Sequence, residues 1–175
     1  GYYWEAAAYG PKISVIDLES GDYLYSSESL SPGMIQQVAP FVGPDGTVYG
    51  TRTMNNVSTD FLFALNDKGN YFEEKWSLPL GYVPFATFGV GPDGSIYSYS
   101  QSDEVIRIDP LYGNVIDTSE VNLGGDFSQP RMAIDAQGFV FVTNGGFTSG
   151  ALHSFNPDLT LRWSENITNV NVGSP

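Results

Sequence analysis

The chain contains no cysteine and a single histidine, and its charged residues are few and mostly acidic. Without cysteine it has no disulfide scaffold, no thiolate zinc site and no cysteine nucleophile. A single histidine also excludes motifs in which two histidines bind a metal. Twenty acidic against seven basic residues give a net charge of −13, which repels nucleic-acid phosphates and anionic lipid surfaces. No apolar run is long enough to span a bilayer, so we expect neither a nucleic-acid partner nor membrane insertion.

Residues that favour turns and strands are abundant. The 175 residues include 20 Gly and 11 Pro, which favour turns, and 11 Tyr and 11 Phe, which favour strands. Hydrophobic residues make up 41% of the chain, enough for a core in one domain. No segment has convincing helical periodicity; the nearest, "GMIQQVAP" (33–40), is short and ends in proline. The composition therefore predicts an all-β domain.

A turn followed by a strand recurs along the chain, as "VGPDGTVYG" (42–50), "VGPDGSIYS" (90–98) and the looser "IDAQGFVFV" (134–142). The turn glycines are 48 and then 44 residues apart: Gly46, Gly94 and Gly138. A second set of glycines has the same two spacings: Gly21, Gly69 and Gly113. Two independent markers with one spacing indicate a tandem repeat.

Each repeat predicts a turn, a strand, a variable loop, a second strand, another turn and a third strand. The second strand of each copy ends in an Asp or Asn that can accept backbone N–H bonds in the following turn: Asp17, Asn66, Asp109 and Asn156. In the fourth copy, Asp158 or Leu159 replaces the glycine of that turn. A proline opens each following unit: Pro40, Pro84, Pro130 and Pro175. The approximate repeats are 1–39, 40–83, 84–129 and 130–175, and four antiparallel strands in about 45 residues are typical of a β-propeller blade.

Two of these units resemble the quinoprotein-type (PQQ-like) propeller repeat, whose pattern is a proline, a DG-x-VYV strand, an LYALD strand, a glycine turn and a tryptophan. "PFVGPDGTVYGTR…FLFALNDKGNYFEEKW" follows it from Pro40 to Trp76, and "PRMAIDAQGFVFVTN…ALHSFNPDLTLRW" follows it from Pro130 to Trp163. The resemblance implies that Trp76 and Trp163 pack neighbouring blades together. The third unit lacks the tryptophan, and "GVGPDGSIYSYSQSDEVIRIDPLYGNVI" also resembles an NHL or streptogramin-lyase repeat.

The resemblance further implies a ring of roughly seven or eight blades. We therefore expect the chain to form a partial ring, about four blades of a larger propeller. The alternative is a compact four-bladed ring in which "ITNVNVGSP" (167–175) completes the first blade. Exposed blade edges would favour pairing with another copy or with the rest of a larger propeller.

Three kinds of residue have side chains that could take part in binding or catalysis. The turn aspartates Asp45, Asp93 and Asp135 are isolated and form no DxDxDG pattern, so we interpret them as structural rather than as calcium ligands. His153 lies at an ordinary strand position, and we expect a local hydrogen bond. Arg107 stands where other copies have Ala or Ser; it can pair with a carboxylate or hold an anion, and pairing is favoured. We assign no catalytic residue, no cofactor and no metal ligand.

The loops between the first and second strands are the candidate ligand-facing segments, because propellers place ligands on loops at one face. These loops are 53–60, 100–104 and 144–150. Their candidate ligand-facing side chains are polar: Asn55, Asn56, Gln101, Asp103, Asn144 and Thr148. Such groups suit a carbohydrate, a peptide or water, so a protein or carbohydrate partner is expected.

The propeller fold carries dehydrogenases, lyases, scaffolds and binding proteins, so the resemblance implies the fold and not the function. The favoured hypothesis is a non-catalytic binding or scaffolding segment of a secreted, periplasmic or cell-surface protein, with the compartment taken from the resemblance. One alternative is part of a quinone-dependent dehydrogenase or a lyase whose active site lies outside this segment. The other is a structural subunit of an extracellular assembly.

Overall fold

A computed structural model of the chain describes residues 2–7, 10–28, 34–35, 40–53, 60–81, 87–121, 123, 131–145 and 149–168. All regular elements in these ranges are β-strands. The same ranges hold no helix long and apolar enough to cross a membrane. The chain divides into two compact units, Gly1–Gly81 and Tyr82–Pro175, and each is described by itself.

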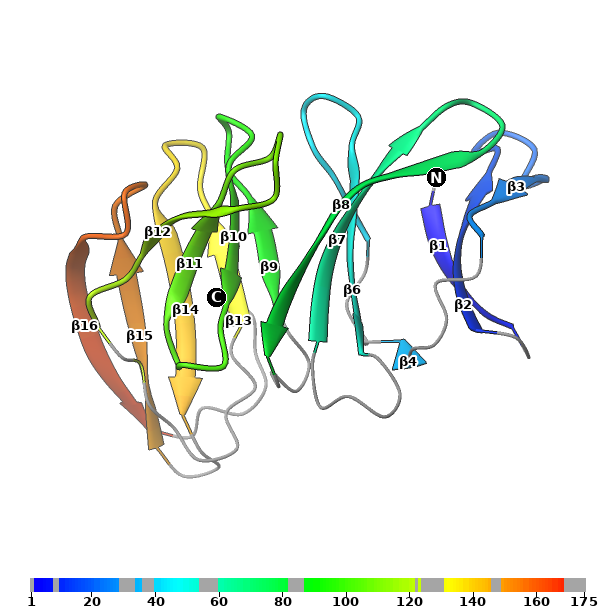
Figure 1. The fold of residues 1–175 in the computed structure, drawn as a ribbon. Helices are drawn as coiled ribbons and strands as arrows, with labels where there is room; N and C mark the ends of the chain where they lie inside the picture. The colour runs from blue at the N-terminus through cyan, green and yellow to red at the C-terminus, as the bar shows by residue number, and fades with distance from the viewer. Residues whose placement is uncertain are drawn as a thin grey trace. The chain divides into compact units, whose positions relative to one another are not determined.

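The first unit contains two antiparallel sheets (Figure 1). Blade 1 has the strand order β1-β2-β3, with β1 (Tyr2–Ala7), β2 (Gly10–Ile16) and β3 (Tyr23–Ser26). Blade 2 has the order β4-β6-β7-β8, and β5 also pairs with β6. Its strands are β4 (Met34–Ile35), β5 (Phe41–Val42), β6 (Val48–Thr53), β7 (Asp60–Asp67) and β8 (Phe72–Gly81).

The second unit contains two four-stranded antiparallel sheets whose strands follow one another in chain order (Figure 1). Blade 3 consists of β9 (Phe88–Val90), β10 (Ile96–Tyr99), β11 (Val105–Ile108) and β12 (Val115–Thr118). Blade 4 consists of β13 (Arg131–Ile134), β14 (Val140–Gly145), β15 (Ser149–Phe155) and β16 (Leu161–Thr168). The prediction of an all-β fold built from antiparallel propeller blades is confirmed.

The repeated turn adopts one conformation in blades 2, 3 and 4. Its glycine has a positive φ in each case: Gly46 (83°), Gly94 (85°) and Gly138 (84°), a region that costs an L-residue free energy because of its Cβ atom. The turn of blade 4 between β15 and β16 has no glycine, and Leu159 adopts φ 63° in its place. Its side chain is buried, so packing offsets the backbone cost.

The predicted capping of the turns before the outer strands differs between blades. Asp17 and Asp109 accept two backbone N–H bonds each, from Glu19 and Ser20 and from Leu111 and Tyr112. In blade 2 the Gly69 N–H binds Asp67 instead, which is the last residue of β7. In blade 4 the Thr160 N–H binds Asp158, while the Asn156 amide donates to the Thr160 hydroxyl.

A β-bulge recurs between the last two strands of every blade. The register shifts after Val15, Ala64, Arg107 and Ser154. Each shift leaves one extra residue on the outer strand: Leu24, Lys75, Ile116 and Arg162. A bulge of this kind re-aims the side chains around it, and it positions the site described below.

Neighbouring blades contact each other through a tyrosine in both units. Tyr25 of blade 1 donates its hydroxyl proton to Asp67 Oδ1 of blade 2 (2.5 Å), and its ring centroid lies 5.7 Å from that of Phe72. Tyr97 of blade 3 donates to the Pro157 carbonyl of blade 4 (2.8 Å). Asp67 and Pro157 are the same repeat position, directly after the residue that ends the predicted second strand. In both units, therefore, this turn accepts a hydrogen bond from the preceding blade.

Candidate functional site

In blades 2 and 4 the bulge residue is a cation that lies against the residue following the turn glycine. Lys75 Nζ is 3.4 Å from Asp45 Oδ2 and 3.4 Å from Thr47 Oγ1. The Arg162 guanidinium lies 3.7 Å from the centroid of the Phe139 ring, a cation–π distance. Both bulges thus turn a cation back onto the turn that precedes β6 or β14 in their own blade.

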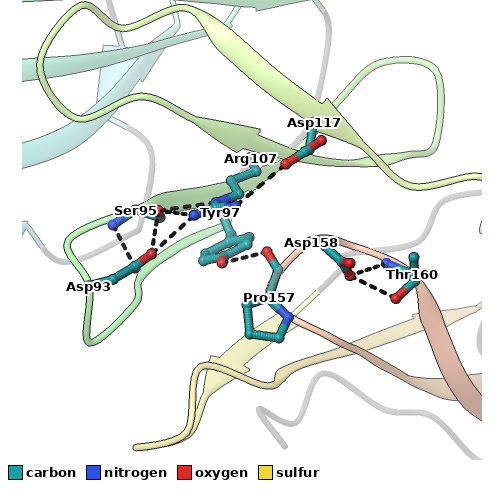
Figure 2. A network of polar contacts seen from close by, with 8 residues as sticks. All are labelled: Asp93, Ser95, Tyr97, Arg107, Asp117, Pro157, Asp158 and Thr160. Atoms are coloured by element: carbon teal, nitrogen blue, oxygen red, sulfur yellow. Dashed lines mark hydrogen bonds and ion pairs between the residues drawn. The ribbon is translucent and has the colours of Figure 1, made fainter.

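Blade 3 has Ile116 at the bulge, and there the cation comes from the neighbouring strand (Figure 2). Arg107 of β11 donates from Nε and Nη2 to Ser95 Oγ, at 3.1 and 2.9 Å. The same Nη2 is 3.0 Å from Asp93 Oδ2, and Nη1 is 3.5 Å from Asp117 Oδ2. The interpretation of Arg107 as a partner of nearby carboxylates is confirmed, with Asp93 and Asp117 as the partners.

The strand register shows which residue stands in blade 3 where blades 2 and 4 have a tryptophan. Trp76 pairs with Ala64 across β7 and β8, and Trp163 pairs with Ser154 across β15 and β16. The equivalent pair in blade 3 is Arg107 with Asp117. A small residue beside a tryptophan is thus replaced by an arginine beside an aspartate.

The ring contacts of the other blades show what this replacement changes. The Trp76 ring is tilted against that of Tyr49 with 5.8 Å between ring centroids, and the Trp163 and Phe141 ring centroids are 6.2 Å apart. Tyr97 is the equivalent of Tyr49 and Phe141, and its cross-strand neighbour is Arg107. The arginine therefore occupies the side of the tyrosine that tryptophan covers in the other two blades (Figure 2).

The polar contacts around the turns lower the pKa values of Asp93 and Asp158. Partial burial alone would raise the pKa of Asp93, but the hydrogen bonds from the Ser95 N–H and hydroxyl and the charge of Arg107 outweigh it and lower the pKa. The pKa of Asp158 is lowered chiefly by its hydrogen bonds with Thr160, with a smaller contribution from Arg107. Burial raises the pKa of the Tyr97 hydroxyl, which keeps it protonated as the donor to Pro157.

His153 is held on both ring nitrogens inside blade 4. Its Nδ1 lies 2.8 Å from Ser164 Oγ, and its Nε2 lies 3.2 Å from Asn144 Oδ1. With the Asn144 oxygen as acceptor, the imidazole proton sits on Nε2, and Nδ1 accepts from the serine hydroxyl. Burial lowers the pKa of His153, so the neutral ring is favoured. The interpretation of His153 as a strand histidine with local hydrogen bonds is confirmed.

The candidate ligand-facing residues fall in different settings. Asn144 lies in β14 rather than in a loop, and its side chain is buried beside His153. Gln101 is exposed at the tip of the loop between β10 and β11. Asp103 has φ 59° and accepts a 3.2 Å hydrogen bond from the Tyr99 hydroxyl. Asn55, Asn56 and Thr148 lie outside the described residues.

The two tryptophans differ in exposure, with Trp76 buried at 8% and Trp163 at 38%. The resemblance implies, for dehydrogenases, calcium ligands and a catalytic aspartate that converge. Within the described ranges no three or more His, Asp or Glu side chains gather as a metal site. Asp45 and Asp93 instead accept the N–H and hydroxyl of Thr47 and Ser95, so these residues do not fit such a group.

No protein-family model matches the chain, and neither does any curated protein sequence. Solved structures do match. A protein from Lactobacillus plantarum superposes with a TM-score of 0.64 at 13% identity, over 95% of this chain and 53% of that one. BamB from Moraxella catarrhalis gives 0.57 at 14% identity, over 93% and 47%. A europium-containing methanol dehydrogenase gives 0.55 at 13% identity, over 78% and 27%.

These likenesses show the fold, which is a β-propeller. The chain spans about half the length of the first two structures and about a quarter of the third. At this level of identity the activities of those proteins do not transfer to this chain.

Proposed function

We propose that the chain is a non-catalytic β-propeller segment that serves as a binding or scaffolding module. The observation that supports it most is the use of the reactive side chains for structure. Arg107 is engaged by Asp93, Ser95 and Asp117, and His153 by Asn144 and Ser164. A general base or an oxyanion-binding cation must be able to reach a substrate. Groups that already have two or more internal partners are poor candidates for that work.

The loop between β10 and β11 is the best supported binding element. Its backbone closes through the Ser100 N–H to the Glu104 carbonyl (2.9 Å) and the Asp103 N–H to the Ser100 carbonyl (3.1 Å). The Leu123 N–H binds the Asp103 carbonyl at 2.7 Å. The backbone of this closed loop, which presents the exposed Gln101, has little conformational entropy left to lose on binding, which favours affinity.

The proposal is tested by glycan and peptide arrays probed with the 175-residue protein. The matched variant is Gln101→Ala, and the control is Tyr112→Ala, which changes another exposed turn of the same blade. The proposal expects a defined class of carbohydrate or peptide whose signal falls in Gln101→Ala and persists in Tyr112→Ala. Conversion of an array ligand into a product, detected by mass spectrometry, would refute a non-catalytic role.

The enzyme alternative places the active site of a quinone-dependent dehydrogenase or lyase outside this segment. The methanol dehydrogenase likeness favours the first version, and the NHL-like third repeat favours the second. The other alternative, a structural subunit of an extracellular assembly, predicts purified protein that polymerises. We propose a secreted, periplasmic or cell-surface location on the strength of the PQQ-like resemblance alone.

A further inference from the structure

The hairpin that joins β11 to β12 in blade 3 holds four apolar side chains in water. Two lie in its turn, Leu111 at 57% exposure and Tyr112 at 73%, and two begin β12, Val115 at 42% and Ile116 at 44%. All four fall within six positions of the chain. Single exposed apolar residues are ordinary, whereas a contiguous group of them indicates an interaction site. We call residues 111–116 the apolar hairpin.

The equivalent strand positions of blade 2 are charged. Glu74 and Lys75 stand there in the places of Val115 and Ile116. Charged side chains on an outer strand discourage association with other chains, and the apolar hairpin lacks this protection. Blade 1 has an apolar pair on its outer strand as well, but polar residues stand at the two turn positions: Glu19 and Ser20.

The position of Arg107 accounts for the exposure of Ile116. In blades 2 and 4 the bulge residue is a cation, Lys75 or Arg162, that folds back over the turn of its own blade. In blade 3, Arg107 reaches that turn from β11 and binds Asp93. The place that a bulge residue covers in the other two blades is therefore already filled, and Ile116 extends into water.

Carboxylates border the apolar hairpin. Asp117 directly follows it in the chain, and Asp93 and Asp117 share the charge of Arg107 (Figure 2). Asp158 of blade 4 interacts with the same charge. Three carboxylates around one guanidinium leave an excess of negative charge beside the apolar side chains. The complementary partner therefore carries apolar side chains flanked by lysine or arginine.

Other occupants fit this surface less well. A second copy of the chain would bring a net charge of −13 to the same carboxylates, and an anionic lipid surface would be repelled in the same way. A further blade does not fit either. Blade 3 meets blade 4 through the face of its sheet, where Tyr97 donates to the Pro157 carbonyl, whereas β12 is the edge strand of that sheet.

We infer that the apolar hairpin of blade 3 docks a basic, apolar segment of another protein. The apolar side chains of that segment cover Leu111, Tyr112 and Ile116, and its lysines or arginines approach Asp117. The hairpin follows β11, whereas the loop that presents Gln101 precedes it. The inference is therefore independent of a ligand at Gln101.

Selection of peptides from a displayed random-sequence library on the 175-residue protein tests the inference. We expect the selected peptides to combine apolar residues with lysine or arginine, and to bind less tightly as the salt concentration rises. Ile116→Lys gives blade 3 the bulge residue of blade 2, and it should raise the Kd of these peptides about 10-fold or more. Tyr71→Lys adds the same charge at another exposed aromatic residue and should leave the Kd unchanged.

Gln101→Ala separates this surface from the loop of the proposed function. A partner of the apolar hairpin keeps its affinity in Gln101→Ala and loses it in Ile116→Lys, and a ligand of the loop does the reverse. Leu111→Lys repeats the test at a second exposed position, and circular dichroism checks that each variant is folded. Failure to select any peptide, peptides without basic residues, or an equal loss in Tyr71→Lys would overturn the inference. Self-association of the protein that Ile116→Lys abolishes would overturn it as well.

Discussion

Replacing Arg107 by alanine removes the one cation that holds blade 3 together at the turn. Its side chain is 22% exposed, and those of Asp93 and Asp117 are 52% and 42% exposed. Solvent therefore screens both ion pairs, and each contributes about 0.5 kcal/mol. The two hydrogen bonds to Ser95 Oγ have a charged donor and add about 1 kcal/mol. We expect Arg107→Ala to lower the free energy of unfolding by about 2 kcal/mol.

The double variant Arg107→Ala/Asp117→Trp tests the origin of this loss. It gives blade 3 the small residue and tryptophan found at Ala64 and Trp76. The new ring can contact Tyr97 as Trp76 contacts Tyr49, which should restore about 1 kcal/mol. Asp117→Trp alone should destabilise the protein, because Arg107 still fills the space. The two changes must therefore couple strongly.

Urea unfolding monitored by circular dichroism measures the stability of all four proteins, the wild type included. The measurement is made at low salt and in about 0.5 M sodium chloride, where the Debye length is only a few ångströms. The Arg107→Ala effect should shrink at the higher salt, since part of it is ionic. An Arg107→Ala effect below about 0.5 kcal/mol at low salt, or strictly additive changes, would refute this account of the network.

Three further changes test the blades by urea unfolding. Gly138→Ala should lower the free energy of unfolding by about 1 kcal/mol more than Gly94→Ala. Both glycines have a positive φ, but only at Gly138 would the new Cβ meet Pro157 Cγ, at 3.2 Å. Leu159→Gly removes the backbone cost of φ 63° but also removes a buried side chain. We expect a net loss of about 1–3 kcal/mol in the free energy of unfolding. A gain would show that packing there is weak. Burial lowers the pKa of His153 below 6.5. As the pH drops below that value, the unfolded state therefore takes up the proton first and the free energy of unfolding falls. His153→Gln should flatten this part of the stability profile against pH.

The repeat and its turns could be predicted because they depend on local sequence. A glycine at a fixed spacing marks a backbone position with positive φ, and Gly46, Gly94 and Gly138 have it. Strand pairing in such a repeat follows from chain order, since short turns join antiparallel neighbours. The approximate repeat boundaries at Pro84, Pro130 and Pro175 lie outside the described residues and stay a prediction.

The composition of the polar network could not be predicted to the same depth. A β-bulge changes which residues face each other by one position, and nothing in the local sequence marks it. Arg107 could be expected to find a carboxylate, but its pairing with Asp117 in place of a tryptophan depends on that register. The polar neighbours of Asn144 predict a loop, whereas β14 extends through it to Gly145. Leu159 at φ 63° depends on tertiary packing that propensity does not encode.

The absorption spectrum and metal content of the protein purified from its natural source test the central claim most directly. The claim is that the polar side chains of these blades serve structure and recognition rather than redox chemistry. It predicts a spectrum of aromatic absorption alone and no stoichiometric calcium. A bound quinone band with an equivalent of calcium would contradict it and place the protein among the quinone-dependent enzymes.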